Sequence, residues 1–426
     1  MAVARPSALR PHTVPPIVGG RECVFDVVID LSPLRTTSRY QGIGSFLWEL
    51  VHALRKVPPG DRLGIRVGLL RAFDRGRPAL CALDDDDFEP PEAPAINWSS
   101  RRQVWARRVG LTLAIRHANC RLFHMPEALG MPIGPNPPRI VTCNDLIPLK
   151  LPALYSTKPA ALMRMRRMPH EIYRYRSARR IIAISEATRD DLVALLGVSP
   201  GRIDVVYPGV DTTRFSAVTG ALDAGAVVRK HGLSKPYFIH VGTADPRKSL
   251  PLLVEAYGKS GVAGGVDLVL AGRLLATHAS ALRAEAAALG CSGGLKLLGF
   301  VEDRELSVLY QGCVALLYPS VYEGFGLPVL EAMACGAPVV TTTGGALPEV
   351  APEGTALLVP PGEERAFRDA IARIARDAPL RRDLCARGRA NVLRFTWKSC
   401  AENTLRSYAR ALAPRSKSHG RSNSEG

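Results

Sequence analysis

Glu323 and Glu331 lie eight positions apart and enclose two glycines. The apolar run 314–318 before them predicts a strand, and Gly324 and Gly326 permit backbone conformations that other residues disfavour. A short helix is predicted next, because a proline in its first turn and a glycine just past its end are typical of helix boundaries. The free N–H groups and the positive dipole end at such a strand-to-helix junction indicate a phosphate-binding loop.

The two carboxylates indicate which kind of phosphate compound this loop accepts. An acid in contact with a pyrophosphate would repel it, so each glutamate is expected to hydrogen-bond a hydroxyl on one side of the phosphates. A nucleotide sugar offers this arrangement, with its ribose on one side of the pyrophosphate and a hexose on the other. A strand, loop and helix with surface glutamates, in which the glycines serve only for turning, is the structural alternative.

The stretch EGFGLPVLEAMACGAPVV resembles the signature of retaining glycosyltransferases of the GT-B fold, the family 4 or "glycosyl transferases group 1" type, and the similarity runs from about Phe25 to Leu412. It implies an α/β fold of two Rossmann-like doubly wound domains facing a central cleft, with the donor in the C-terminal domain and the acceptor in the N-terminal one. It also implies retention by front-side attack, in which the leaving diphosphate helps to take the acceptor proton. Within this stretch the resemblance implies six donor-site residues: Glu323 for the sugar, Glu331 for the ribose, and Gly324, Phe325, Gly326 and Leu327 in the loop.

Further donor contacts follow from other parts of the C-terminal half. HVGTADPRKSLPLLVEAY is similar to the family's strand, phosphate loop and helix, which implies that Arg247 and Lys248 neutralise the donor diphosphate. Fixed cations there would stabilise the departing diphosphate more than the ground state. Thr243 stands where the family often has an arginine, and surface cations that cap a loop are the alternative reading of the pair. Four more positions are implied near the donor: Gly272 and Arg273, for which a plain turn is as good an explanation, and Phe300 and Val301 beside the nucleobase.

Three segments of the N-terminal half also resemble the family. VVIDLSPLRTTSRYQGIGSFLWELVHAL is similar to its first strand, flexible glycine loop and first helix, so Gly42 and Gly44 are expected to approach the diphosphate, with a tight turn into the helix as the alternative. LFHMPEALG places His124 at a strand end in the cleft, as a catalytic or sugar-contacting residue or as a structural hydrogen-bonder. In VTCNDLIPLK, Asn144 replaces the usual histidine and Asp145 keeps the family's acid, and both are candidate catalytic residues.

Short apolar runs alternate with helix-length segments twice along the chain, which predicts two parallel sheets covered by helices. The predicted strands are 25–29, 63–69, 122–123, 139–142, 180–184 and 203–207 in the first half, and 237–241, 266–271, 295–298, 314–318, 338–342 and 356–359 in the second. The predicted organisation is a disordered tail 1–20, an acceptor domain 21–215, a linker 216–234, a donor domain 235–395, a helix 396–413 crossing back to the first domain, and a disordered tail 414–426.

Composition excludes several other classes. A chain of 426 residues with 46% hydrophobic residues is neither fibrous nor wholly disordered. Nine scattered cysteines without a C-x-x-C pair argue against a disulfide framework or a zinc ribbon and favour a reducing compartment. No apolar run reaches the roughly 18 residues that a membrane span needs. A nicotinamide dehydrogenase is rejected because the third glycine of its fingerprint is absent after Gly326.

The positive charge is concentrated in one block. The net charge is +17, and residues 101–200 supply +11 of it, with 17 Lys and Arg against 6 Asp and Glu. Such a block suits anionic lipid headgroups, a pyrophosphate-bearing acceptor or nucleic acid, with a solvated arginine-rich surface as the alternative. A non-enzymatic nucleic-acid-binding protein is the alternative from another class, but no motif for it is present, and the glutamate pair favours an enzyme.

The resemblance therefore implies a retaining, metal-independent hexosyltransferase, similar to bacterial enzymes of lipopolysaccharide or polysaccharide biosynthesis. The acidic run 84–87 is interpreted as a solvated loop, so no metal is expected, and no cofactor besides a nucleotide sugar co-substrate. Mannose or a related hexose is favoured as the transferred sugar, with UDP and GDP both open, and the expected acceptor is a glycan or a lipid-linked sugar. Nucleic acid is not expected as a partner. The expected location is cytoplasmic, peripheral at the inner face of the membrane.

Overall fold

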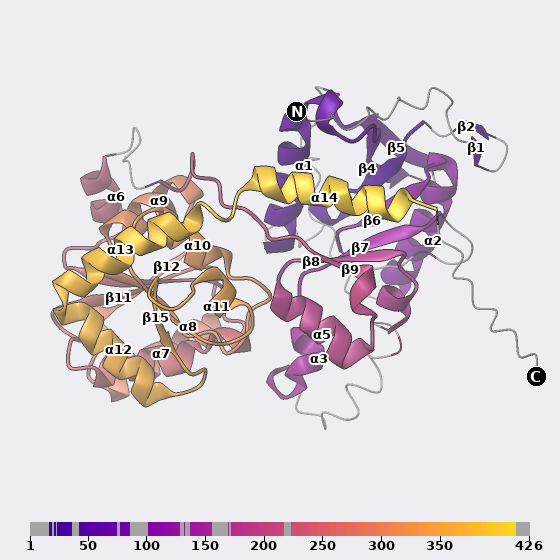
Figure 1. Cartoon of the computed structure of the whole chain (residues 1–426). Coiled ribbons are helices and arrows are strands. Elements are labelled where there is room, and N and C mark those ends of the chain that lie inside the picture. Colours follow the sequence, from indigo (N-terminus) through magenta and orange to yellow (C-terminus); the bar gives the residue numbers. More distant parts are fainter. Residues whose placement is uncertain are drawn as a thin grey trace, which may run out of the picture.

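The computed structural model describes residues 17–18, 21–22, 24–35, 42–74, 77–85, 101–127, 132, 137–155, 169, 172–216 and 223–414. These residues form two α/β domains that lie side by side, each built around a mainly parallel sheet (Figure 1). The predicted fold class, two doubly wound α/β domains, is confirmed. Among the described residues, no helix combines the length and the apolar character that crossing a membrane requires.

The N-terminal domain contains a seven-stranded sheet in the order β5-β4-β3-β6-β7-β8-β9. Only the pair β4 and β5 is antiparallel; the other neighbours run parallel. Strands β3, β6 and β7 are buried along their whole length, because helices cover both faces of a parallel sheet. The bounds are β3 (Val27–Asp30), β4 (Val67–Asp74), β5 (Arg77–Ala82), β6 (Leu122–Met125), β7 (Arg139–Cys143), β8 (Arg180–Ala183) and β9 (Ile203–Val205).

The C-terminal domain contains a six-stranded, wholly parallel sheet in the order β12-β11-β10-β13-β14-β15. This is the strand order 3-2-1-4-5-6 of dinucleotide-binding domains, whose ligands bind beyond the carboxyl ends of the strands where the order reverses. The reversal lies between β10 and β13. The bounds are β10 (Tyr237–Val241), β11 (Asp267–Ala271), β12 (Leu295–Gly299), β13 (Ala315–Tyr318), β14 (Val339–Thr342) and β15 (Leu357–Val359).

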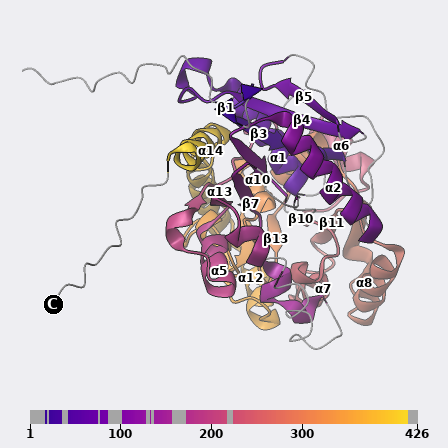
Figure 2. The ribbon, with the colours of Figure 1, turned by 90° about the vertical axis from the view of Figure 1, so that its right-hand side faces the viewer.

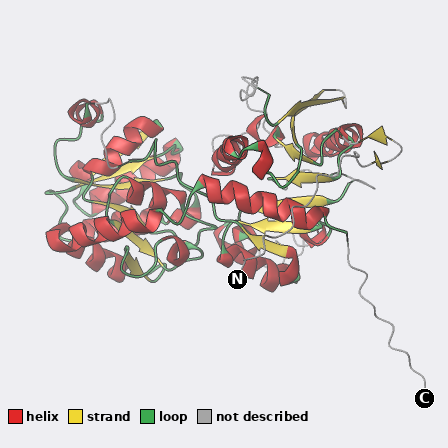
Figure 3. Cartoon of the chain, turned by 45° about the horizontal axis from the view of Figure 1, so that its top comes forward, coloured by secondary structure: helices red, strands yellow, loops and turns green. Residues whose placement is uncertain are grey.

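Helices pack on both faces of each sheet (Figure 3). Successive strand residues point to opposite faces, so Phe238 packs in a core with α7, α8 and α12, whereas Ile239 packs in a second core with α9 and α10. The bounds of the α-helices named in Figure 1 or below are α1 (Gly42–Lys56), α2 (Arg101–Ala118), α3 (Ile147–Lys150), α5 (Glu186–Leu196), α6 (Ala224–Lys230), α7 (Leu250–Lys259), α8 (Ala276–Ala288), α9 (Asp303–Gly312), α10 (Leu327–Ala334), α11 (Leu347–Val350), α12 (Glu364–Arg376), α13 (Ala378–Val392) and α14 (Trp397–Leu412).

The chain passes between the two domains twice, once after β9 and once before α14. Helix α14 returns from the C-terminal domain and packs against α1, which places the helix predicted over 396–413 on the N-terminal domain (Figures 1 and 2). Gly209, in the first passage, lies against the backbone of the second passage at Thr396 and Trp397. A Cβ on Gly209 would fall 2.2 Å from the Trp397 nitrogen. Val210 N donates to Phe395 O at 3.1 Å. The two passages are therefore in direct backbone contact.

Two of the predicted boundaries need correction. The predicted linker 216–234 contains helix α6, which packs against α9 and buries Val227, because its apolar face completes the C-terminal domain. Residues 217–222 lie outside the described residues. The predicted disordered tail 1–20 contains β1 (Ile17–Val18), which pairs with β2 (Arg21–Glu22).

Candidate active site

The loop between β13 and α10 is held in a conformation that requires its glycines. Gly326 has a φ of 116°, in the left-handed region, and stands at the N-cap of α10. Gly324 packs on the other domain, because a Cβ there would lie 2.1 Å from the carbonyl oxygen of Asn144. The helix begins at Leu327, so that Pro328 lies in its first turn as predicted. The strand, glycine loop and short helix predicted from the sequence are therefore confirmed.

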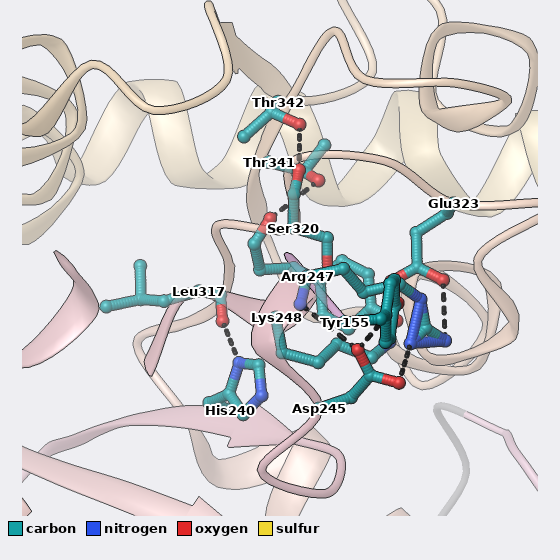
Figure 4. A network of polar contacts seen from close by, with 11 residues as sticks. Tyr155, His240, Asp245, Arg247, Lys248, Leu317, Ser320, Glu323, Thr341 and Thr342 are labelled. Atoms are coloured by element: carbon teal, nitrogen blue, oxygen red, sulfur yellow. Dashed lines mark hydrogen bonds and ion pairs between the residues drawn. The ribbon is translucent and has the colours of Figure 1, made fainter. Parts of the chain in front are cut away.

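Glu323 forms the centre of a buried charged cluster at the point where the strand order reverses. Its side chain accepts a hydrogen bond from Lys248 Nζ at 2.6 Å and pairs with Arg247 Nη2 at 3.4 Å (Figure 4). Burial raises the pKa of Glu323, but the charges of Lys248 and Arg247 outweigh burial and hold this pKa below its usual range. The structure thus brings together the sugar and diphosphate candidates of the sequence, from two different loops.

Lys248 is fixed by residues that sequence reasoning did not single out. Its Nζ contacts the hydroxyl of Tyr318 and lies 4.3 Å from the centroid of that ring. The Tyr318 ring stacks on His240, with centroids 5.7 Å apart. His240 Nδ1 carries its proton, because it donates at 2.9 Å to the carbonyl of Leu317, which can only accept. These side chains come from β10 and β13, whose apolar runs gave no signal beyond burial.

Arg247 has one donor that remains available for a ligand. The guanidinium pairs with Asp245 Oδ2 at 3.1 Å through Nη1, and with Glu323 through Nη2. Its Nε is buried and has no hydrogen-bond acceptor among the described residues. A buried donor without an acceptor is costly, and an anionic ligand oxygen would satisfy it.

Glu331 lies in a different environment from Glu323. Its Oε2 accepts a hydrogen bond from Tyr310 at 3.3 Å. Burial, followed by the negative charge of Asp303, raises the pKa of Glu331 to about 7. The two glutamates therefore have opposite pKa shifts, as in active sites where two carboxyls have different roles.

The remaining donor candidates lie at neighbouring strand ends. A Cβ at Gly272 would fall 1.9 Å from the carbonyl oxygen of Gly242, so the ends of β10 and β11 require a glycine there. The guanidinium of Arg273 lies 5.1 Å from the centroid of the Phe300 ring, which is 63% exposed. The Val301 side chain is buried, which leaves its main chain for a contact.

Asn144 and Asp145 reach the same site from the N-terminal domain. They follow β7, and the Asn144 carbonyl lies against Gly324. Burial raises the pKa of Asp145, and the charges of Arg247 and Glu323 also act on it. Asn144 Nδ2 donates to the carbonyl of Pro126 at 3.3 Å. The structure therefore brings this predicted pair to the glutamate loop.

The expectation that His124 faces the cleft is wrong. The imidazole is fully buried and is hydrogen-bonded to Tyr408 Oη at 2.7 Å and to Thr142 Oγ1 at 2.8 Å. Burial lowers the pKa of His124 to about 3, so the ring is neutral. His124 joins β6 to α14 and is the structural hydrogen-bonder of the two alternatives.

Gly42 and Gly44 lie in a helix and not in the flexible loop expected from the sequence, and their approach to the diphosphate stays a prediction. Both residues stand in the first turn of α1, because the amphipathic pattern of that helix begins there, and Gly44 is buried. Residues 36–41, which precede the helix, lie outside the described residues.

The acidic run 84–87 shows no metal-site geometry where it is described. Asp84 forms a bidentate ion pair with Arg62, with N···O distances of 2.6 and 2.7 Å. Residues 86 and 87 lie outside the described part of the chain. Within the described ranges, no three His, Cys, Asp or Glu side chains are grouped so that they could hold a metal ion.

Two family models match most of the chain. The model described as Glycosyltransferase Family 4 matches residues 40–214, and the model described as Glycosyl transferases group 1 matches residues 227–391. The chain therefore belongs to the glycosyltransferases of the GT-B fold, which confirms the resemblance seen in the sequence.

Several curated relatives are mannosyltransferases or related enzymes. O-antigen chain mannosyltransferase B of Escherichia coli is 28% identical over 72% of this chain and 77% of that protein. MMP alpha-(1->4)-mannosyltransferase of Mycolicibacterium hassiacum is 32% identical over 55% of this chain, and D-inositol 3-phosphate glycosyltransferase of Mycobacteroides abscessus is 33% identical over 55%. The match spans about half the length of these last two proteins, 54% and 53%.

Solved structures share the fold. Sucrose-phosphate synthase from Thermosynechococcus elongatus has a TM-score of 0.70 at 21% identity, covering 90% of this chain and 98% of that one. HepE from Anabaena, in complex with UDP and glucose, has a TM-score of 0.67 at 17% identity, covering 91% and 100%. WaaG, a glycosyltransferase involved in lipopolysaccharide biosynthesis, has a TM-score of 0.66 at 16% identity, covering 89% and 98%.

Proposed function

We propose that this glycosyltransferase is a retaining, metal-independent hexosyltransferase that moves a hexose from a nucleoside diphosphate sugar to a hydroxyl of a glycan or lipid-linked acceptor. The observation that carries the proposal is the buried cluster of Glu323, Lys248 and Arg247 at the carboxyl ends of β10 and β13. The mannosyltransferases among its relatives favour mannose and a role in cell-surface polysaccharide biosynthesis.

The geometry supports a division of roles within the donor site. Arg247 and Lys248 bind the diphosphate and stabilise the negative charge that grows on it as the glycosidic bond breaks. Glu323, kept ionised by these cations, accepts hydrogen bonds from hydroxyls of the hexose. Glu331 accepts hydrogen bonds from the ribose. Asp145 and Asn144 face the hexose from the acceptor domain, and the leaving diphosphate takes the acceptor proton.

A panel of UDP and GDP sugars tests this function directly. A ligand at 100 times its dissociation constant stabilises the folded state by about 2.7 kcal/mol, which a thermal-shift measurement detects. We expect one nucleotide sugar of the panel to raise the melting temperature and to be consumed when an acceptor is added, also in the presence of EDTA. If no member of the panel stabilises the protein, the proposal is wrong.

Donor binding is expected to depend on pH through Glu331. With a pKa of about 7, this carboxyl is partly protonated at neutral pH, and the ionised form accepts hydroxyl hydrogen bonds more strongly. The dissociation constant of the donor should therefore fall as the pH rises through about 7, with release of a proton on binding.

Calorimetric titrations in buffers of different ionisation enthalpy measure this proton release. The Glu331→Gln variant should lose the pH dependence, whereas Glu363→Gln, at an exposed carboxyl outside the site, should keep it. Donor binding by the wild type that does not change with pH would contradict the ribose role.

We also propose that the enzyme works as a cytoplasmic protein at the inner face of a membrane, where a lipid-linked acceptor would be found. The block 101–200, with its charge of +11, supports this proposal, since each Lys or Arg near an anionic surface adds about 1 kcal/mol of attraction. The exposed Trp105 and Leu113 on α2 add apolar contact area on the same block.

Vesicle sedimentation tests the membrane proposal. The protein should bind anionic vesicles at low salt, dissociate from them at high salt and not bind neutral vesicles. Replacing Arg164, Arg166 and Arg167 by alanine should weaken vesicle binding and leave nucleotide binding unchanged. The matched variant with Arg283, Arg382 and Arg389 replaced, three exposed arginines of the C-terminal domain, should bind vesicles as the wild type does. Failure to bind anionic vesicles at low salt would indicate a soluble acceptor.

A further inference from the structure

One short segment of the N-terminal domain contacts both loops of the donor site. The segment 147–155 contains α3 and the 3₁₀ turn Pro152–Leu154, and it begins two residues after Asp145. Tyr155 Oη donates to Asp245 Oδ1 at 3.0 Å, and Lys150 Nζ donates to Tyr322 Oη at 3.1 Å. Each of these bonds joins the two domains.

The bond from Tyr155 reaches Arg247 through Asp245. Asp245 Oδ1 also accepts the backbone N–H of Arg247 at 3.1 Å, and Oδ2 pairs with Arg247 Nη1 at 3.1 Å. Figure 4 shows Tyr155, Asp245 and Arg247 grouped beside Glu323. Burial and the neighbouring Asp245 raise the pKa of Tyr155, so its hydroxyl keeps the proton that it donates. Tyr155 of the N-terminal domain thus holds the Asp245 carboxylate, and this carboxylate in turn orients the Arg247 guanidinium.

The bond from Lys150 reaches the glutamate loop in the same way. Tyr322 directly precedes Glu323 in the chain and is 9% exposed. Its hydroxyl donates to Asp191 Oδ2 at 2.6 Å, and Lys150 Nζ pairs with Asp191 Oδ1 at 2.5 Å. The Lys150–Asp191 ion pair of the N-terminal domain therefore holds Tyr322, the residue next to Glu323.

We propose that Tyr155 is a positioning residue of the transfer reaction, which aligns Arg247 through Asp245 when the two domains meet. Tyr322 does the same for Glu323 through Lys150 and Asp191. The inference rests on the proposed function. The segment 147–155 already contacts Asp245 in the free protein and holds Arg247 in the orientation that transfer needs. Tyr155 therefore acts on turnover more than on nucleotide binding.

The variant Tyr155→Phe tests this role, since it removes one hydroxyl and no packing. Loss of a hydrogen bond to a charged group should lower kcat about tenfold, while the dissociation constants of UDP and GDP change less than about threefold. The melting temperature should fall by no more than a few degrees, as expected for the loss of one hydrogen bond. Tyr173→Phe, the same change at a tyrosine of this domain that is 48% exposed, should leave all these quantities unchanged.

A wild-type kcat in Tyr155→Phe would overturn the proposal. A fall in kcat that is accompanied by an equal weakening of UDP or GDP binding, or by a fall of more than a few degrees in the melting temperature, would also overturn it, because a merely structural residue gives that pattern. Rates in Tyr155→Phe/Tyr322→Phe should fall further, although the ion pair of Lys150 with Asp191 remains within its own domain.

Hydrogen–deuterium exchange on the free protein separates a failure of this inference from a failure of the proposed function. The Arg247 amide is bonded to Asp245, so a peptide covering 243–249 should exchange faster in Tyr155→Phe than in the wild type or in Tyr173→Phe. Unchanged exchange overturns the positioning role, whatever the substrate. If exchange is faster but no nucleotide binds, the proposed function fails and the contact between the domains stands.

Discussion

Replacing Lys248 by alanine is expected to lower kcat about a thousandfold, the loss typical of removing one preorganised group that stabilises transition-state charge. Lys248 is 6% exposed, and its Nζ lies 2.6 Å from Glu323. Removal of this cation takes away stabilisation of the departing diphosphate, and it leaves Glu323 with Arg247 at 3.4 Å as its remaining ion pair among the described residues. Initial-rate measurements with saturating donor report the effect.

Lys235 provides the matched control for this prediction. It stands in the same domain, is exposed, and donates to the carbonyl of Gly264 at 2.8 Å. The Lys235→Ala variant should therefore turn over at the wild-type rate. Comparable rates for Lys248→Ala and Lys235→Ala would refute the role of Lys248, provided that the melting temperatures show both variants to be folded.

Much of the fold could be predicted from the sequence because parallel strands buried on both faces are continuous apolar runs. The bounds of β10 agree with the predicted 237–241, and those of β13 and β14 differ by one residue at one end. Strand β5 was missed. It is an antiparallel edge strand that begins with Arg77 and Pro78, so the segment lacks the continuous apolar run of the buried strands.

The parts of the candidate site that could be predicted are the loops whose sequences carry recognisable motifs. The glutamate loop and the Arg247–Lys248 turn meet, as expected from their positions after β13 and β10. Tyr318 and His240 were not predicted, because their polar contacts arise only when these two strands pair. His124 was misplaced for a similar reason: its hydrogen-bond partner Tyr408 is 284 residues further along the chain. Contacts between distant segments leave no local pattern.

Glu323→Gln is expected to lower kcat by about a hundredfold or more while nucleotide binding is kept or strengthened. Glu323 pairs in the free protein with Lys248 and Arg247, the two cations that we propose bind the diphosphate. A neutral glutamine frees Lys248 and Arg247 for the diphosphate, so the dissociation constants of UDP or GDP should not rise. The same change removes the ionised acceptor for the hexose hydroxyls, which the transition state needs.

Glu331→Gln should give the opposite result. Its carboxyl has a pKa of about 7 and accepts a hydrogen bond from Tyr310. Loss of its ribose contact should weaken donor and nucleotide binding about tenfold, with a smaller fall in kcat. Calorimetric dissociation constants and single-turnover rates separate the two effects. Equal and small effects of both variants on binding and on rate would contradict both assignments, because the proposal gives each glutamate a different part of the donor.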